Sequence, residues 1–304
     1  MKQMKNNVLL VLTALVWGCA FVAQSVGMDY VGPFTFNAVR CLIGAAVLIP
    51  VILFMDKSAR KSGLTDEEMK SRRGETKTLV TGGICCGLAL GIASSLQQWG
   101  ILFTTVGKAG FITAMYIVLV PVLGIFVHRK PGINAVVSVL LALVGLYLLS
   151  FTDMGSINIG DILLSGCALA FAVQILLIDR FAPDLDGLRL NCVQSLVVSL
   201  LSVPCIFLNR ETVGLQTILD CWLPLCFAGI FSMGVAYSMQ IIGQKRLDPT
   251  AASLIMSLES VFAALGGWLI LHNTMTPSEL TGCTLVFAGV IVSQVPVHKL
   301  FAHK

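Results

Sequence analysis

Ten runs of about 20 predominantly apolar residues follow one another along this chain of 304 residues, separated by short polar stretches. A lipid bilayer offers no partner for an unpaired backbone amide, so each run must be a helix or a strand of a closed barrel. Continuous apolar runs without strict alternation favour the helix. The sequence therefore predicts an all-α integral membrane protein with ten transmembrane helices, at residues 8–27, 34–55, 79–100, 107–127, 133–150, 160–179, 187–208, 217–240, 249–271 and 277–297.

Charged residues make up only 12% of the chain and hydrophobic residues 56%, whereas soluble domains usually contain about 25% charged residues. Ten crossings consume roughly 200 residues, which leaves no room for a large catalytic domain outside the membrane. The histidines lie at the ends of runs or in the tail and share no cluster with Asp or Cys: His128, His272, His298 and His303. We therefore do not expect an enzyme.

Lys and Arg are unevenly distributed between the stretches that separate the runs. The two termini together with every second stretch hold 17 of the 20 Lys and Arg residues. Under the positive-inside rule, this asymmetry predicts that both termini are cytoplasmic. The basic loops then face anionic lipid headgroups, and no basic face with stacking aromatic residues predicts a nucleic-acid partner.

All ten cysteines fall within apolar runs or at their edges. Such cysteines are expected to pack as small apolar side chains and not to form a disulfide framework. Cys85 and Cys86 are adjacent, with no His or Cys at a spacing suited to a metal. We expect neither a metal site nor a cofactor.

The chain contains an internal repeat. Residues 20–24 (Ala-Phe-Val-Ala-Gln) match residues 170–174 (Ala-Phe-Ala-Val-Gln), and an offset of 154 then pairs Asn37 with Asn191 and Arg40 with Gln194. Each half holds five runs, so the second half must enter the membrane from the opposite side. This pattern predicts two inverted-topology repeats, 1–152 (with a cytoplasmic loop at 56–78) and 153–304, and an alternating-access carrier with a site near the midplane.

Several segments resemble the bacterial EamA-type transporters of the drug/metabolite transporter (DMT) superfamily. In the first half these are 17–18 (Trp-Gly), 31–40 (Val-Gly-Pro-Phe-Thr-Phe-Asn-Ala-Val-Arg), 98–105 (Gln-Trp-Gly-Ile-Leu-Phe-Thr-Thr) and 108–113 (Lys-Ala-Gly-Phe-Ile-Thr). Pro121 and residues 258–268 (Leu-Glu-Ser-Val-Phe-Ala-Ala-Leu-Gly-Gly-Trp) continue the match, with Gly282 and Gly289 after them. The resemblance implies a ten-helix, exporter-like carrier in the DMT/EamA fold. Ser260 stands where the family often has Pro, and Asn273 where it often has Glu, which weakens any transfer of substrate identity.

Glu259 lies ten residues after Pro249, which places it roughly 15 Å into a hydrocarbon core about 30 Å thick. Acidic side chains at that depth persist mainly where they face a cavity, a partner or a substrate. A carboxylate in such surroundings also takes up a proton more readily than one in water. Glu259 is therefore either a proton-coupling or cation-facing group, or a neutral structural group that is hydrogen-bonded.

Arg40 also lies within an apolar run, seven residues past Pro33. Its guanidinium can hold a carboxylate bidentately, or it can extend to the interface and fix helix ends. The remaining polar and aromatic candidates for lining a substrate path, each with interhelical bonding, interface anchoring or core packing as the alternative, are Gln24, Gln174, Gln194, Gln98, Trp17, Tyr116 and Tyr237. Lys108 is expected to be a surface charge.

Pro121 interrupts the fourth run about two-thirds along and Pro204 falls in the seventh, and both are candidates for gating hinges or static kinks. Gly83, Gly87 and Gly91 recur every four residues in the third run. They predict close helix packing within a monomer, with a dimer face as the alternative.

These features predict a secondary active transporter of the bacterial inner (plasma) membrane that moves a small organic metabolite, such as an amino acid or a drug-like compound, and exports it by alternating access. A proton is a possible coupling partner. Among the alternatives, a proton-coupled uptake carrier or a facilitator for a vitamin or nucleobase-like solute stays open. A channel or sensor, and an integral membrane enzyme, are less favoured. No phosphate-binding loop is present in the sequence.

Overall fold

The computed structural model describes residues 2–126, 132–150, 157–245, 247–270 and 276–294, and all regular structure within them is helical. The elements of the first part are α1 (Lys2–Gly27), α2 (Pro33–Lys61), α3 (Asp66–Arg73), α4 (Thr76–Gly100), η1 (Ile101–Phe103), α5 (Val106–Ala114), α6 (Tyr116–Phe126) and α7 (Ile133–Ser150). Those of the second part are α8 (Ile159–Phe181), η3 (Ala182–Asp184), α9 (Gly187–Leu208), α10 (Leu215–Asp220), α11 (Trp222–Cys226), η4 (Phe227–Ala236), α12 (Tyr237–Gln244), α13 (Pro249–Met256), α14 (Leu258–Ile270) and α15 (Pro277–Gln294).

Seven stretches of the described residues are long and apolar enough to cross a membrane, judged by length and composition. Shorter apolar helices cover Ile133–Leu149 and Pro249–Leu265. The expected boundary between residues 152 and 153 lies outside the described residues, as do Asn273 and all four histidines. The chain is thus a multi-pass membrane protein with an all-helical fold.

Two of the expected helices are divided. The fourth run forms α5 and α6, which meet at Met115, and the ninth forms α13 and α14, which meet at Ser257. The amide of Met115 bonds the carbonyl of Ile112, only three residues back, and so tightens the turn. The candidate hinges or kinks Pro121 and Pro204 lie inside α6 and α9. The expected start of the eighth run at residue 217 was wrong, because residues 217–220 belong to the separate helix α10.

Helices α2 and α9 run antiparallel and are fixed to each other at both ends. At one end, Glu211 accepts hydrogen bonds from the backbone amides of Phe34 and Thr35 at 3.0 and 2.8 Å. At the other end, Asp56 pairs with Arg189. These contacts hold two of the long helices in register beside the central polar residues.

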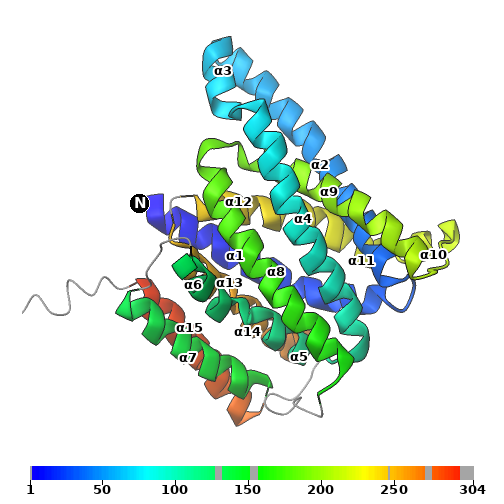
Figure 1. Cartoon of the computed structure of the whole chain (residues 1–304), viewed down its shortest axis with the longest axis vertical. Coiled ribbons are helices and arrows are strands. Elements are labelled where there is room, and N and C mark those ends of the chain that lie inside the picture. Colours follow the sequence, from blue (N-terminus) through cyan, green and yellow to red (C-terminus); the bar gives the residue numbers. More distant parts are fainter. Residues whose placement is uncertain (1, 127–131, 151–156, 246, 271–275, 295–304) are drawn as a thin grey trace, which may run out of the picture.

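Glycines permit close approach of other helices. A Cβ at Gly83 would lie 2.3 Å from Val193 of α9, and one at Gly87 would lie 2.6 Å from Val197. Gly91 faces Leu201 in the same way, so packing of this glycine stripe within the monomer is confirmed. Helices α7 and α15 lie side by side at one edge of the bundle, and α3 projects at the opposite end (Figure 1).

Candidate functional site

A narrow cavity lies among α1, α2, α4, α6, α8, η4, α12 and α14, and the space between its lining atoms, about 430 Å³, includes space that is open to solvent. Its walls approach each other closely, because the ring centroids of Trp17 and Tyr237 are only 4.8 Å apart. The cavity is lined by Trp17, Phe21, Gln24, Arg40, Gln97, Tyr116, Phe171, Ile175, Ser232, Tyr237, Gln240 and Glu259. It combines one basic and one acidic side chain with aromatic and amide groups.

Arg40, on α2, is only 3% exposed. Its Nη1 donates to Gln24 Oε1 at 2.8 Å, and its Nε and Nη2 donate to Asn37 Oδ1 at 3.1 and 2.9 Å. These partners are neutral, and among the described residues no carboxylate pairs with Arg40. Arg40 therefore carries an uncompensated positive charge at the cavity and does not extend to an exposed surface.

Glu259, in the first turn of α14, is only 4% exposed. Tyr116 Oη donates to its Oε1 at 3.1 Å. Within the described part of the chain, no Lys or Arg pairs with this carboxylate. Burying an unpaired ion costs several kcal/mol, so the arrangement is suited to a carboxyl group that takes up a proton or meets a cation.

Amide side chains extend the polar lining. Gln240 Nε2 donates to Gln174 Oε1 at 3.3 Å. The aromatic wall includes Tyr116 and Phe171, whose ring centroids lie 6.4 Å apart in an edge-on arrangement. Together these groups offer hydrogen bonds and flat apolar faces to a small polar solute.

Six of the residues that the sequence suggested line the cavity: Trp17, Gln24, Arg40, Tyr116, Tyr237 and Glu259. Three others are not among its lining residues. Gln98 donates to the carbonyl of Gln24 at 3.2 Å, Gln194 donates to Asn191 Oδ1 at 2.9 Å, and Gln174 bonds Gln240.

Six lining residues were not among the sequence-based candidates: Phe21, Gln97, Phe171, Ile175, Ser232 and Gln240. Phe21 and Phe171 occupy the same place in the repeated pentapeptides at 20–24 and 170–174, so the repeat itself could have found them. Ser232 lies in η4, a π-helical stretch whose altered register a regular helical pattern does not reveal.

The expectation that Lys108 is a surface charge was wrong. Lys108 is 6% exposed, and its Nζ lies 2.8 Å from Asp161 Oδ2. The first turn of α8 supplies Asp161 and thus a carboxylate that the sequence pattern did not connect with Lys108.

Charged side chains buried around an internal cavity, in a bundle of long apolar helices, are typical of a membrane transport protein. The model of the EamA-like transporter family matches residues 4–151 and, a second time, residues 158–294. The chain belongs to this family and is a transporter, not an enzyme.

Individual relatives agree with this assignment. The chain is 30% identical to an uncharacterized transporter of Archaeoglobus fulgidus over 97% of its own length and 88% of the relative's. It is 29% identical to the threonine/homoserine exporter RhtA of Escherichia coli, over 58% of this chain and 59% of RhtA. One solved crystal structure, 20% identical in sequence, aligns with a TM-score of 0.74 over 97% of this chain and 98% of that one, and so shares its fold.

Proposed function

We propose that this protein is an alternating-access secondary carrier that exports a zwitterionic amino acid across the bacterial inner membrane. The observation that carries the proposal is that Arg40 and Glu259 line the same cavity, each without a partner of opposite charge among the described residues. A ligand with one carboxylate and one ammonium group satisfies both. The name of the relative RhtA, a threonine/homoserine exporter, supports the same substrate class and direction.

In this account the architecture consists of ten transmembrane helices in two inverted repeats, 1–152 and 153–304, with both termini in the cytoplasm. Repeated contacts support it. Asn37 accepts from Arg40, and Asn191 accepts from Gln194, with the same three-residue spacing. The carboxylates of Asp56 and Glu211 each hold the first turn of the opposite repeat's helix, at Arg189 and Thr35 respectively.

Each substrate charge has a suitable partner. The planar guanidinium of Arg40 can bind a carboxylate through its free donor positions, and its neutral partners leave its charge intact. Glu259 accepts the ammonium, with Tyr116 Oη fixing one carboxylate oxygen. The rings of Trp17 and Tyr237, which pack on each other, form an apolar wall beside the side chain of the substrate.

The same geometry supplies a coupling step. Without substrate, two unpaired buried charges are unfavourable, and a proton on Glu259 removes one of them. Arrival of an ammonium group favours the charged carboxylate and releases the proton. Exchange of a proton for the amino acid would let a proton gradient directed into the cell drive export.

Counterflow in proteoliposomes tests this function. Purified protein is reconstituted with unlabelled L-threonine inside, and uptake of labelled L-threonine or L-homoserine is followed over time. A carrier gives a transient, saturable accumulation above the external concentration, whereas a channel gives only equilibration. Absence of counterflow for every zwitterionic amino acid, with counterflow of a vitamin or nucleobase-like solute, would contradict the proposed substrate class.

A further inference from the structure

Two sharp corners each pack against the start of a helix distant in sequence. We define the outer corner as residues 100–108, from the end of α4 through η1 into α5, and the inner corner as residues 243–245 and 247–251, from α12 to α13. The outer corner packs on the first turn of α8, where a Cβ at Gly160 would lie 2.8 Å from the carbonyl of Gly100. The inner corner packs on α1, where a Cβ at Gly243 would lie 3.0 Å from Leu10.

An equivalent hydrogen bond, donated by an Asn side chain, closes each corner. Asn158 Nδ2 donates to the carbonyl of Phe103 at 3.0 Å, and Asn6 Nδ2 donates to the carbonyl of Lys245 at 2.9 Å. Each bond joins the start of a long helix to a corner from the other half of the chain. Alternating access requires one such contact to open while the other stays closed.

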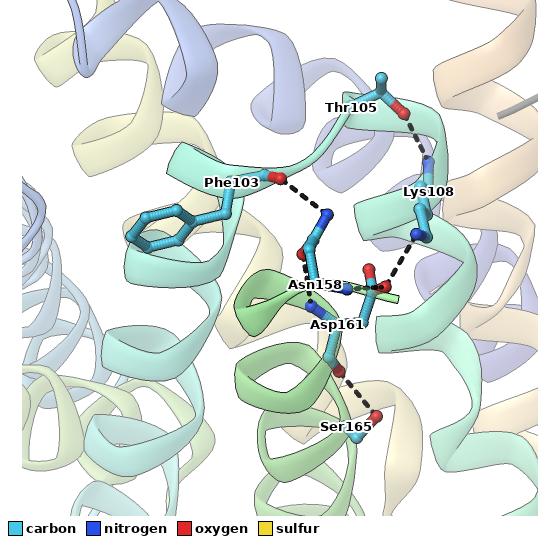
Figure 2. A network of polar contacts seen from close by, with 6 residues as sticks. All are labelled: Phe103, Thr105, Lys108, Asn158, Asp161 and Ser165. Carbon is cyan, nitrogen blue, oxygen red and sulfur yellow. Dashed lines mark hydrogen bonds and ion pairs between the residues drawn. The ribbon is translucent and has the colours of Figure 1, made fainter. Parts of the chain in front are cut away.

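The outer corner has an additional contact, the ion pair of Lys108 Nζ with Asp161 Oδ2 at 2.8 Å (Figure 2). The two side chains are 8% and 11% exposed. Asp161 Oδ2 also accepts from the amide of Asn158 at 3.0 Å, so the pair is joined to the Asn158 contact. At the outer corner, Lys108 is the third residue after the N-cap of α5, Thr105. The third residue after the N-cap of α13 at the inner corner is Ala251, which carries no charge. Among the described side chains, no ion pair links α1 with α13.

An ion pair between two segments that move apart in the transport cycle acts differently from an ion pair inside a rigid core. While the corner is closed, removing one partner leaves the other charge nearly buried, which is unfavourable. When the corner opens, water solvates both charges. The pair is therefore formed in one state only, and it favours that state by its own interaction free energy.

We propose that Lys108 and Asp161 form the latch of the outer gate, so that the pair must break before the cavity opens to the outside. The inference rests on the alternating access and membrane orientation proposed above. It assigns to the two residues a role in the transport cycle that does not require contact with the substrate.

The test measures access to the cavity from each side. A reporter cysteine replaces Ser232, which lines the cavity, and intact cells are labelled with a membrane-impermeant maleimide, with reporter-free protein as the background for native cysteines. The latch variant Lys108→Met/Asp161→Asn removes both charges together. We expect its labelling rate from outside to rise about tenfold, equivalent to a shift of about 1.4 kcal/mol between the states.

The inner corner provides a matched control, since Asn6→Ala removes the hydrogen bond from the Asn6 side chain to the carbonyl of Lys245. This variant should raise labelling only in inside-out vesicles. Unchanged labelling of the latch variant from outside, or an equal rise from both sides, would overturn the proposal. If the double variant does not reach the membrane, Asp161→Asn alone keeps an acceptor oxygen for the amide of Asn158 and must show the same one-sided rise.

Labelling needs no substrate, so the latch test and the counterflow test fail independently. A latch variant that opens outward in a protein without amino-acid counterflow refutes the proposed substrate and leaves the latch supported.

Discussion

The guanidinium of Arg40 donates two hydrogen bonds to a single oxygen, Asn37 Oδ1, at 3.1 and 2.9 Å. Asn37 is itself held in place, because its Nδ2 donates to Ser94 Oγ at 3.1 Å and to Ser202 Oγ at 3.0 Å. Neutral groups thus orient the positive charge of Arg40 without compensating it. This arrangement makes Asn37 a positioning residue for the proposed carboxylate site.

Asn37→Asp should place a carboxylate that competes with the substrate carboxylate for Arg40. The new carboxylate pairs with Arg40, while the hydroxyls of Ser94 and Ser202 can rotate to donate to it. We expect counterflow of a zwitterionic amino acid to fall at least about tenfold, in line with losing a charge-assisted contact, while counterflow of the corresponding amino-acid amide changes little. Equal loss for both compounds would mean that the substitution only damages the fold.

Tyr116→Phe removes the only hydroxyl that donates to Glu259 among the described residues and keeps the ring that packs on Phe171. The loss of a hydrogen bond to a charged group costs about 1.5–3 kcal/mol. The half-saturating amino-acid concentration should therefore rise about tenfold or more in counterflow. Tyr30→Phe, at a residue that is 46% exposed, is the control and should transport like the parent. A Tyr116→Phe protein with unaltered concentration dependence would remove this hydroxyl from the site.

Glu259→Gln should uncouple transport from pH. The glutamine cannot exchange a proton, so an imposed pH gradient should no longer accelerate net export of the amino acid from proteoliposomes. Glu67→Gln, at an exposed position in α3, should retain the full response. Stimulation by the pH gradient that persists in the Glu259→Gln protein would exclude Glu259 as the coupling group.

Gly282→Ala should destabilise the contact between α7 and α15. A Cβ there would lie 2.5 Å from the carbonyl of Gly145 and 2.7 Å from the amide of Leu149, both backbone atoms that cannot move independently. Overpacking of this kind costs about 1–3 kcal/mol, so the midpoint of thermal unfolding in detergent should fall. Gly110→Ala is the matched control, because its Cβ would meet only Ser260 Oγ, at 3.6 Å. Equal midpoints for the two variants would refute the close contact.

The sequence predicted the helical membrane fold because lipid imposes a strong and local requirement: every long apolar run must satisfy its own backbone. It did not predict the divisions at Met115 and Ser257, which depend on short-range bonding and packing instead of apolarity. Pro121, a candidate hinge or kink, lies inside α6, six residues after the division at Met115.

The candidate site was predictable where a polar residue is unusual for its position. Arg40 and Glu259 stand out in apolar runs, and both line the cavity. Gln98 and Gln194 stand out equally, yet they do not line the cavity, because sequence does not define which face of a helix points inward when nearly all faces are apolar. Lys108 was misinterpreted for a related reason: its partner Asp161 is 53 residues away, and only the tertiary structure brings them together.

The most direct test of the account compares a zwitterion with analogues that each lack one of its charges. L-Threonine, its methyl ester without a carboxylate, and 3-hydroxybutanoate without an ammonium group compete for counterflow in the parent, in Arg40→Gln and in Glu259→Gln. We predict that the parent favours threonine over both analogues, that Arg40→Gln no longer distinguishes threonine from the ester, and that Glu259→Gln no longer distinguishes it from the hydroxy acid. Identical preferences in all three proteins would contradict the central claim that Arg40 and Glu259 bind the two charges of the substrate.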